Sequence, residues 1–300
     1  MSGQLKEVRE RISSVKNTQQ ITKAMKMVSA AKLRRAQQAI TEMRPYADRL
    51  NKILANILSN ISADEAGTSF GVEREIQKAL IIVITSNRGL AGAFNSNIIK
   101  AALAKIEELG GADSQRVNVL CIGKKGADVF KKRISADRLN LDYVTLFDDL
   151  SFENVAQVSQ LAMEGFEALE YDAVYVSYSK FKNAAVQFAI AEQFLPVIQS
   201  KPEISAGDQD NNTAKSDYIF EPSKEELLQE LIPTILQTTF QKYILDTHAS
   251  EHGARMTAMD KATENADDML KDLKITYNKA RQEAITKELS EIVGGAAALG

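Results

Sequence analysis

The sequence contains one cysteine, no tryptophan and only five prolines in 300 residues. A single cysteine excludes an intramolecular disulfide, and Cys121 stands in the apolar run 119–122, which is typical of a small buried side chain. No apolar run reaches the roughly 18 residues of a membrane-spanning helix. The N-terminus shows neither a secretory hydrophobic region nor an Arg/Ser-rich import leader. We therefore expect a chain that is made and used in a cytoplasm.

Acidic residues are missing from one long stretch near the N-terminus. Residues 1–60 hold twelve Lys/Arg against four Asp/Glu, a net charge of +8 that leaves −11 for the rest of the chain. Solvated helix faces usually mix the two signs, so a stripe of one sign indicates an acidic partner. Between Ile12 and Thr41 the charged residues are all basic: Lys16, Lys23, Lys26, Lys32, Arg34 and Arg35.

The same N-terminal stretch has a heptad pattern. Its seam positions alternate by three and four residues from Leu5 to Ile61, which predicts a long coiled-coil helix over 1–61. Such a helix needs a partner stripe to be stable in water. Four polar residues replace hydrophobic ones in the middle of the seam, so we expect something other than a dry apolar partner there: Gln19, Thr22, Lys26 and Ser29.

After Ile61 the pattern changes to short apolar runs separated by helical segments. The runs predict three strands, at 79–84, 117–122 and about 141–146. Helices are predicted from the loop after the first strand to about 109, at 127–132, and at about 152–169 with Ser151 as N-cap. Strands that alternate with helices predict a mostly parallel sheet. Two alternating segments around the turn 182–183 predict a hairpin at its edge: 172–181 and 185–194.

The C-terminal third returns to helix. Residues 199–222 are polar and poorly patterned, which predicts a mobile loop, and Ser223 with Glu226 forms a capping-box pattern. A second heptad seam then runs from Leu245 to Ala284, and Gly294 with Gly295 is the first point after it where a break in the helix is expected. The predicted division is 1–61 helix, 75–198 α/β domain, 199–222 loop and 223–300 helix. The predicted fold is therefore α/β, an antiparallel coiled coil of the N- and C-terminal helices with an inserted Rossmann-like domain.

Two patterns could carry chemistry. The loop holding Arg88, Gly89 and Gly92 follows the first strand, where nucleotide folds bind phosphate, but it lacks the glycine spacing of such sites and reads as a tight turn. His248 and His252 match the zinc-hydrolase pattern H-x-x-E-H. However, His252 lies in the second seam, where a substrate has little room.

The motifs at the start of the chain resemble a known family. Q-Q-I-T-K-A-M-K-M-V at 19–28, K-L-R-R-A at 32–36 and R-P-Y at 44–46 resemble the N-terminal helix of the gamma subunit of F-type ATP synthases. S-N-R-G-L-A-G-A-F-N at 86–95 is similar to the first strand–helix loop of that family.

The C-terminal motifs point to the same family. A-S-E-H-G-A-R-M-T-A-M at 249–259 and Y-N-K-A-R-Q at 277–282 resemble its C-terminal helix, and 285–296 fits the pattern I-T-x-E-x-x-[DE]-x-x-x-G-A. The resemblance implies a rotor shaft without catalytic residues, metal or cofactor. Its foot domain would carry the loop of Arg88, Gly89 and Gly92.

The resemblance also implies partners and contact residues. The coiled coil would stand inside three alpha and three beta subunits, and the foot would meet the epsilon subunit and the c-ring. The complex would lie on the cytoplasmic side of a bacterial plasma membrane and couple ion transport to ATP synthesis. The implied contacts with the surrounding ring are Met25, Lys26, Arg34, Arg35, Arg255, Gln282 and Thr286.

Two other functions stay open at this point. A coiled-coil adaptor could bind nucleic acid through the basic stripe, or serve as a scaffold. Against nucleic acid, the chain is acidic overall and shows no interleaving of aromatic and basic residues. The other alternative is the zinc enzyme.

Overall fold

Five strands form one sheet in the order β3-β2-β1-β4-β5 in the computed structural model, which describes residues 3–59, 69–71, 74–111, 115–197 and 224–299. The pairs β1–β2, β1–β4 and β2–β3 are parallel, and β5 joins β4 as an antiparallel edge strand. The predicted parallel sheet with an edge hairpin is therefore confirmed. The strands are β1 (Ala79–Ile84), β2 (Val117–Ile122), β3 (Leu139–Asn140), β4 (Ala173–Phe181) and β5 (Gln187–Leu195).

Two helices are much longer than the rest. The α-helices are α1 (Gly3–Ser59), α2 (Phe94–Glu108), α3 (Lys124–Phe130), α4 (Phe152–Glu167) and α5 (Lys224–Leu299). Among the described residues, three short 3₁₀ turns accompany them: η1 (Ser69–Gly71), η2 (Ala136–Arg138) and η3 (Leu146–Asp148). The chain divides into two compact units, residues 1–31 with 255–300, and residues 32–254, so the division falls inside both long helices.

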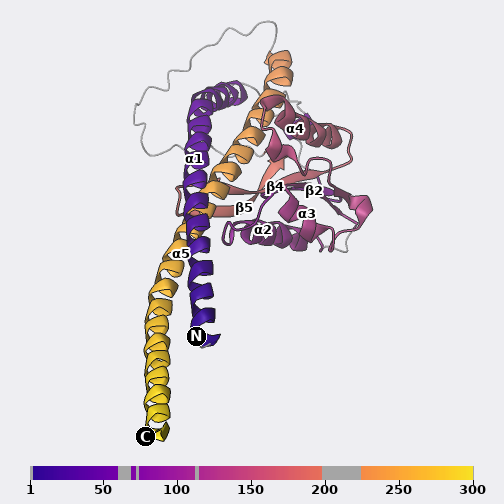
Figure 1. Ribbon diagram of the computed structural model, residues 1–300. Helices are drawn as coiled ribbons and strands as arrows, with labels where there is room; N and C mark the ends of the chain where they lie inside the picture. Colours follow the sequence, from indigo (N-terminus) through magenta and orange to yellow (C-terminus); the bar gives the residue numbers. More distant parts are fainter. Residues whose placement is uncertain (1–2, 60–68, 72–73, 112–114, 198–223, 300) are drawn as a thin grey trace. The chain divides into compact units, whose positions relative to one another are not determined.

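The sheet is the middle layer of the second unit. Strand β1 is buried along its whole length, and its alternate side chains enter two cores. One core contains residues of α2 and α3, and the other contains residues of α4 and of the 232–244 segment of α5 (Figure 1). Helix α2 contributes Ile98, Ala102 and Ile106, whose spacing of four places them on one face.

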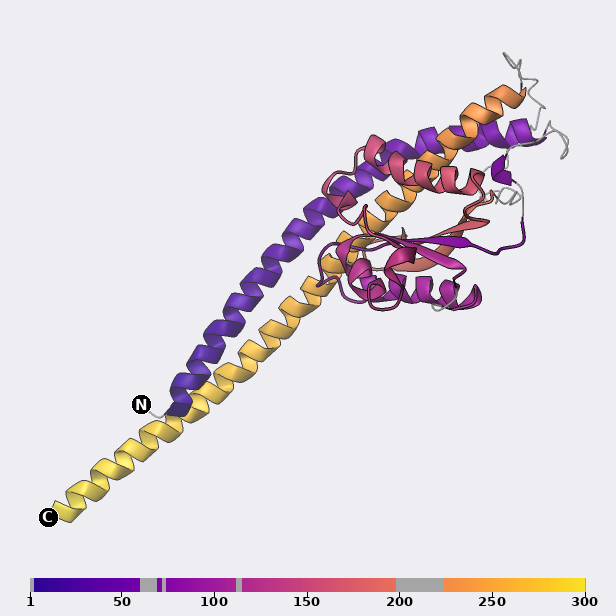
Figure 2. The ribbon, with the colours of Figure 1, turned by 90° about the vertical axis from the view of Figure 1, so that its right-hand side faces the viewer.

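The first unit is a two-helix coiled coil. Figures 1 and 2 show the start of α1 beside the later part of α5, and the cross-helix contacts run antiparallel, from Arg9 with Tyr277 to Lys26 with Asp260. The predicted antiparallel pairing is confirmed. Along α1, every described seam residue from Leu5 to Leu50 is buried or half-buried. The side chain of Leu54, which we expected in the same seam, lies outside the described residues.

Three details of the sequence prediction are wrong. No strand forms at 141–146, because the Asp142 amide donates to the Asn140 side chain (3.0 Å) and turns the chain away after β3. Helix α3 begins at Lys124 rather than 127. Helix α5 does not end at Gly294 but continues to Leu299.

Two predicted helix starts have different outcomes. Ser151 occupies the N-cap position of α4, but its hydroxyl makes no capping hydrogen bond. Its amide instead donates to Asp149 (3.0 Å). Ser223, with its capping box, and the predicted loop 199–222 lie outside the described residues.

Gly123 lies where two loops of the α/β unit come close together. Its φ is +91°, and a Cβ at this position would lie 1.9 Å from the carbonyl oxygen of Thr85. We expect Gly123→Ala to lower the free energy of unfolding by about 3 kcal/mol, since both backbone strain and a clash with main chain oppose it. The measurement is urea unfolding of the purified protein.

Gly294→Ala is the matched control. Gly294 is helical, and a Cβ there would meet nothing within 4 Å. This change should leave the free energy of unfolding unchanged or raise it by about 0.5–1 kcal/mol, because alanine has a higher helix propensity than glycine. If Gly123→Ala unfolded at the same urea concentration as the parent, the close packing on Thr85 would be wrong.

A buried carboxyl group makes the same unit sensitive to pH. Burial raises the pKa of Asp246 to about 6, and the charges of Lys242, Lys180 and Arg44 oppose this shift. An unfolded Asp has a pKa near 3.9, so the cost of ionising Asp246 in the folded state is absent below about pH 4 and fully present above about pH 6.

Asp246→Asn should therefore flatten the dependence of stability on pH. Relative to the parent, the variant should gain on the order of 2 kcal/mol between pH 4 and pH 7, and should keep that gain at pH 8. Urea unfolding of both proteins across this range checks it. A constant difference between the two proteins at every pH would contradict the raised pKa.

Candidate functional site

The polar residues of the α1 seam face polar residues of α5. The amide of Gln19 donates to Asp267, the hydroxyls of Thr22 and Thr263 share a hydrogen bond of 2.8 Å, and the ammonium of Lys26 donates to Asp260. These three pairs form a polar ladder in the middle of the coiled coil, between rungs of hydrophobic residues. The partner that meets these three side chains is therefore the second helix of the chain itself.

Ser29, the fourth polar seam residue, is satisfied on its own helix. It is fully buried, and its hydroxyl donates to the Met25 carbonyl (2.8 Å). A serine that returns its hydrogen bond to the preceding turn presents little polarity to the opposite helix. The seam thus becomes apolar again from Ser29 toward Leu33.

The α5 residues that complete the ladder could not be identified directly from the sequence. Asp260, Thr263 and Asp267 follow the same spacing of three and four as the hydrophobic seam. Thr263 belonged to the predicted seam, and the two aspartates did not. Their spacing, combined with the antiparallel direction, was the available signal.

The predicted contacts on α1 lie in different environments. Arg34 and Arg35 are exposed, and Met25 is half-buried. Lys26 is half-buried and engaged with Asp260, with side-chain exposures of 40% and 46%. A half-exposed ion pair contributes little to stability, about 0–1 kcal/mol, so it is easily broken and remade.

Arg255 differs from the other predicted contacts. Its residue is 8% exposed, so it presents almost no surface to another molecule. A buried guanidinium acts mainly through the groups of its own chain. Direct contact of Arg255 with a surrounding subunit stays a prediction, and only a small part of its surface is available for it.

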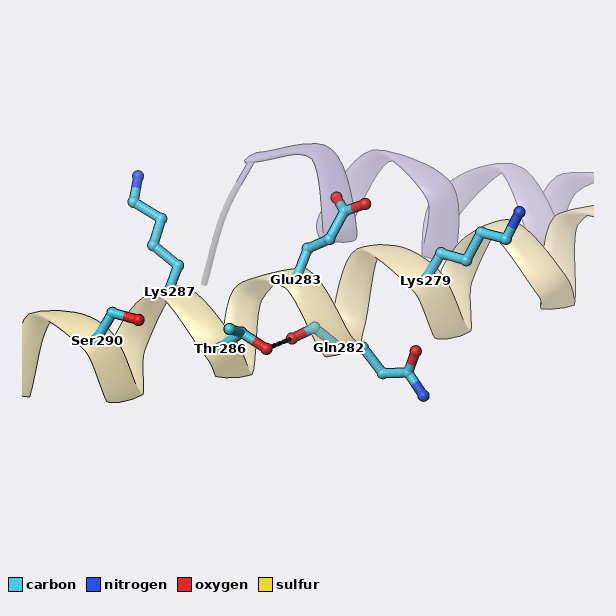
Figure 3. Close-up of a pocket in the computed structure, with 6 residues that line it drawn as sticks. All are labelled: Lys279, Gln282, Glu283, Thr286, Lys287 and Ser290. Atoms are coloured by element: carbon cyan, nitrogen blue, oxygen red, sulfur yellow. Dashed lines mark hydrogen bonds between the residues drawn. The ribbon is translucent and has the colours of Figure 1, made fainter.

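Gln282 and Thr286 lie on the exposed end of α5. Figure 3 shows them in a shallow hollow lined by Lys279, Gln282, Glu283, Thr286, Lys287 and Ser290, in which the Thr286 hydroxyl donates to the Gln282 carbonyl (2.9 Å). All six residues are exposed. Beyond Ala284 the described residues of α5 are exposed on every side, including the apolar Ile285, Leu289 and Ile292.

The loop after β1 is a tight turn held by side chains. The Ser86 hydroxyl donates to the Arg88 carbonyl (2.7 Å), and the Ser86 amide donates to Asn95 (2.9 Å). Gly92 has φ +58°, a left-handed conformation that favours glycine. The structure thus places Arg88, Gly89 and Gly92 in one loop, with Arg88 exposed.

The amides that could bind a phosphate at the start of α3 are already used. Lys124 N–H donates to the Asn87 side chain (3.2 Å), Lys125 N–H to the Ser86 carbonyl (3.1 Å), and Gly126 N–H to the Thr85 hydroxyl (2.8 Å). Nucleotide folds leave such amides open to the ligand. Here they join the first two loops of the sheet.

The crevice between the carboxyl ends of β1 and β4 is also filled. In doubly wound folds this is the topological switch point, where ligands bind. Strand β4 extends past β1, and its Ser179 amide and carbonyl bond the hydroxyls of Thr247 (3.3 Å) and Ser250 (3.1 Å). Helix α5 therefore takes the position that a nucleotide would occupy.

The two histidines contact each other. Their Nε2 atoms are 3.0 Å apart, so one imidazole donates to the other, and the His248 ring stacks on Phe147. Glu251 and His252 are both buried in a helix segment that packs on nearly every side. Within the described ranges, no group of three or more His, Cys, Asp or Glu residues is arranged to hold a metal ion.

The polar ladder predicts a paired effect of substitutions. Thr22→Val or Thr263→Val alone should cost about 1 kcal/mol, because the remaining hydroxyl keeps only the bond to its own helix, at the Gln19 or the Met259 carbonyl, and loses the bond across the seam. The double variant should be close to the parent, because both hydroxyls are gone. Urea unfolding of the four proteins measures the coupling.

Thr41→Val is the control for this cycle. Thr41 is exposed on α1, and its hydroxyl donates only to its own helix, at the Gln37 carbonyl (2.9 Å). Its replacement should change stability by less than about 0.5 kcal/mol. Additive single effects at positions 22 and 263 would show that the two hydroxyls do not pair.

Comparisons with known proteins agree with these features. The family model described as ATP synthase matches residues 4–299. The ATP synthase gamma chain of Cytophaga hutchinsonii is 55% identical over 297 residues, and that of Flavobacterium psychrophilum is 52% identical over 295 residues. Each alignment covers 98% of both chains. Among the helices in the part of the chain described, none is long and apolar enough to cross a membrane.

Solved structures show the same fold at low identity. A chain of the Euglena gracilis mitochondrial ATP synthase is 22% identical with a TM-score of 0.64, and the match covers 100% of this chain and 95% of that one. A rotor chain from the same organism is 21% identical with a TM-score of 0.60, over 95% of this chain and 100% of that one. On the full-length family match and the curated relatives, this chain belongs to the ATP synthase gamma chain family.

Proposed function

We propose that this chain is the central rotor shaft of a proton-translocating F-type ATP synthase of a bacterial plasma membrane. Rotation of the c-ring, driven by ions, would turn the shaft and drive ATP synthesis at the alpha and beta subunits, and ATP hydrolysis would reverse it. The observation that carries this proposal is a coiled coil whose polar seam is satisfied within the chain, in a protein that matches gamma chains over almost its full length.

The proposed partners are three alpha and three beta subunits around the coiled coil, with the epsilon subunit and the c-ring at the α/β unit. The solved structures of similar fold belong to ATP synthase assemblies of the central stalk, F1 and the c-ring, which supports this assignment. The complex would hold the chain on the cytoplasmic side of the membrane. The alternative of a nucleic-acid-binding or scaffold protein has no counterpart among these relatives.

We place ATP chemistry on the surrounding subunits and none on this chain. The support is physical: the amides at the start of α3 and the crevice at the switch point are taken by the chain's own groups. A nucleotide would have to displace these hydrogen bonds, and the histidine pair offers a buried, packed environment instead of an open metal site.

Contacts between shaft and ring must be remade at three stops in each turn. Exposed charges suit this requirement, since an exposed ion pair is worth about 0–1 kcal/mol, whereas losing one member of a buried pair costs about 3–5 kcal/mol. Arg34 and Arg35 are exposed and fit this role, and Gln282 with Thr286 offers a neutral polar surface. Met25 adds a half-buried neutral side chain one position from Lys26.

Met25→Lys should hold the shaft at one stop, because it adds a charge that can pair strongly with acidic groups of beta. We expect assembly to be intact, proton pumping per ATP to fall and the activation barrier of hydrolysis to rise. ATP hydrolysis and ATP-driven pumping are measured side by side in membrane vesicles that carry the complex.

Met25→Gln is the matched control, because glutamine has a similar length and no charge. It should pump and hydrolyse like the parent. Arg34→Ala should lower turnover more than it lowers assembly, since Arg34 is exposed. Parental pumping and hydrolysis by Met25→Lys would contradict the role of transient contacts.

A further inference from the structure

One cation of the N-terminal basic stretch is neutralised by the chain itself. The Lys26 ammonium forms an ion pair with Asp260 of α5, and the two side chains are 40% and 46% exposed. The other five cations between Ile12 and Thr41 are exposed and form no ion pair within the described ranges: Lys16, Lys23, Lys32, Arg34 and Arg35. The stretch therefore presents five charges to its surroundings and compensates the sixth.

The acid that compensates Lys26 is used differently from its neighbours on α5. Asp267, two turns further along, accepts from the neutral amide of Gln19. Glu264, which lies between the two aspartates, is exposed and forms no ion pair among the described residues. Pairing with a cation across the seam is therefore a property of position 260 and not of every acid on this segment.

The groups on either side of Lys26 leave Asp260 to it alone. Thr22 and Ser29, one turn before and one turn after, are buried, and their hydroxyls bond to other groups. A lysine side chain is a flexible stem with a strongly hydrated ammonium. Without the carboxylate, this stem would carry its charge away from the seam, towards whatever surrounds the shaft.

We propose that Asp260 is a positioning residue of the shaft, which holds the Lys26 ammonium at the seam and keeps it from pairing with acidic groups of beta. This inference rests on the proposed function. It also changes the role that the resemblance implies for Lys26, because the direct contact is replaced by a compensated charge.

The covalent arrangement favours Asp260 over an acid of the ring. Asp260 turns together with Lys26, so its carboxylate is at hand at every angle, with the high effective concentration of an intramolecular partner. A carboxylate of beta would be near only at certain stops. An uncompensated ammonium would add a contact at those stops, and each such contact has to be broken before the shaft can turn further.

The first test removes the carboxylate and keeps the size of the side chain, in Asp260→Asn. We expect ATP hydrolysis per assembled complex to fall about threefold, because the released Lys26 pairs with beta. Glu264→Gln is the matched control, since it removes an exposed acid one turn away on the same helix, and it should hydrolyse like the parent. Parental hydrolysis by Asp260→Asn would overturn the proposal.

The second test separates positioning from a merely structural role. If Asp260 acts through Lys26, then Asp260→Asn should change hydrolysis by less than about 1.5-fold in a Lys26→Gln background. Asp260→Glu retains the carboxylate, so it should restore at least half of the parental rate. An equal loss in both backgrounds would show that Asp260 only supports the helix pair, and would overturn the proposal.

Ionic strength gives a third readout on the same complexes. Salt screens exposed charge pairs, so the deficit of Asp260→Asn relative to the parent should shrink between about 0.05 M and about 0.3 M salt. A deficit that stays constant or grows would contradict pairing with the ring. Failure of the rotor function itself is recognised separately, because the parent chain would then not co-purify with alpha and beta subunits.

Discussion

Antiparallel pairing of α1 with α5 through one seam is the interaction on which the structure depends. Neither helix could be stable alone in water at its length, so each needs the stripe of the other. The seam is apolar at its two ends and polar in the middle, where Gln19, Thr22 and Lys26 meet Asp267, Thr263 and Asp260. Burial of the apolar seam residues stabilises the helix pair. The polar residues fix its register, because any other register would leave a buried polar group without a hydrogen-bond partner.

This arrangement separates the two tasks of a shaft. Cohesion is provided inside the seam, so the outer surface can carry weak, exposed groups such as Arg34 and Arg35. In the α/β unit, too, polar groups are satisfied by other groups of the same chain. Thr85 joins the first two loops of the sheet, and Thr247 with Ser250 satisfies the free edge of β4, so positions that bind nucleotides in similar folds are used for packing.

The sequence predicted what depends on local period and failed where tertiary register decides. The heptad positions of α1 match the buried face from Leu5 to Leu50, because a period of 3.5 residues is a property of the helix itself. The partners Asp260 and Asp267 could not be identified without the register of the two helices. The strand expected at 141–146 was lost to the side chain of Asn140, which forms a turn that apolar composition does not reveal. The positive φ of Leu90 and Leu169 could not be predicted either, because a leucine side chain does not indicate a left-handed backbone. Among the contact residues implied by the resemblance, Arg255 is buried. The resemblance identified the position of this residue in the sequence, but it could not show that the side chain is packed within the chain.

Rotation of this chain is the central claim, and direct observation of it is the most decisive measurement. Complexes of the chain with alpha and beta subunits would be immobilised through beta, and a bead attached to a thiol introduced at the exposed position of Lys131 on the α/β unit. On addition of ATP, the bead should turn in one direction and pause at three equally spaced angles. A bead that stays fixed, or moves without preferred angles, while the same complexes hydrolyse ATP would contradict the account.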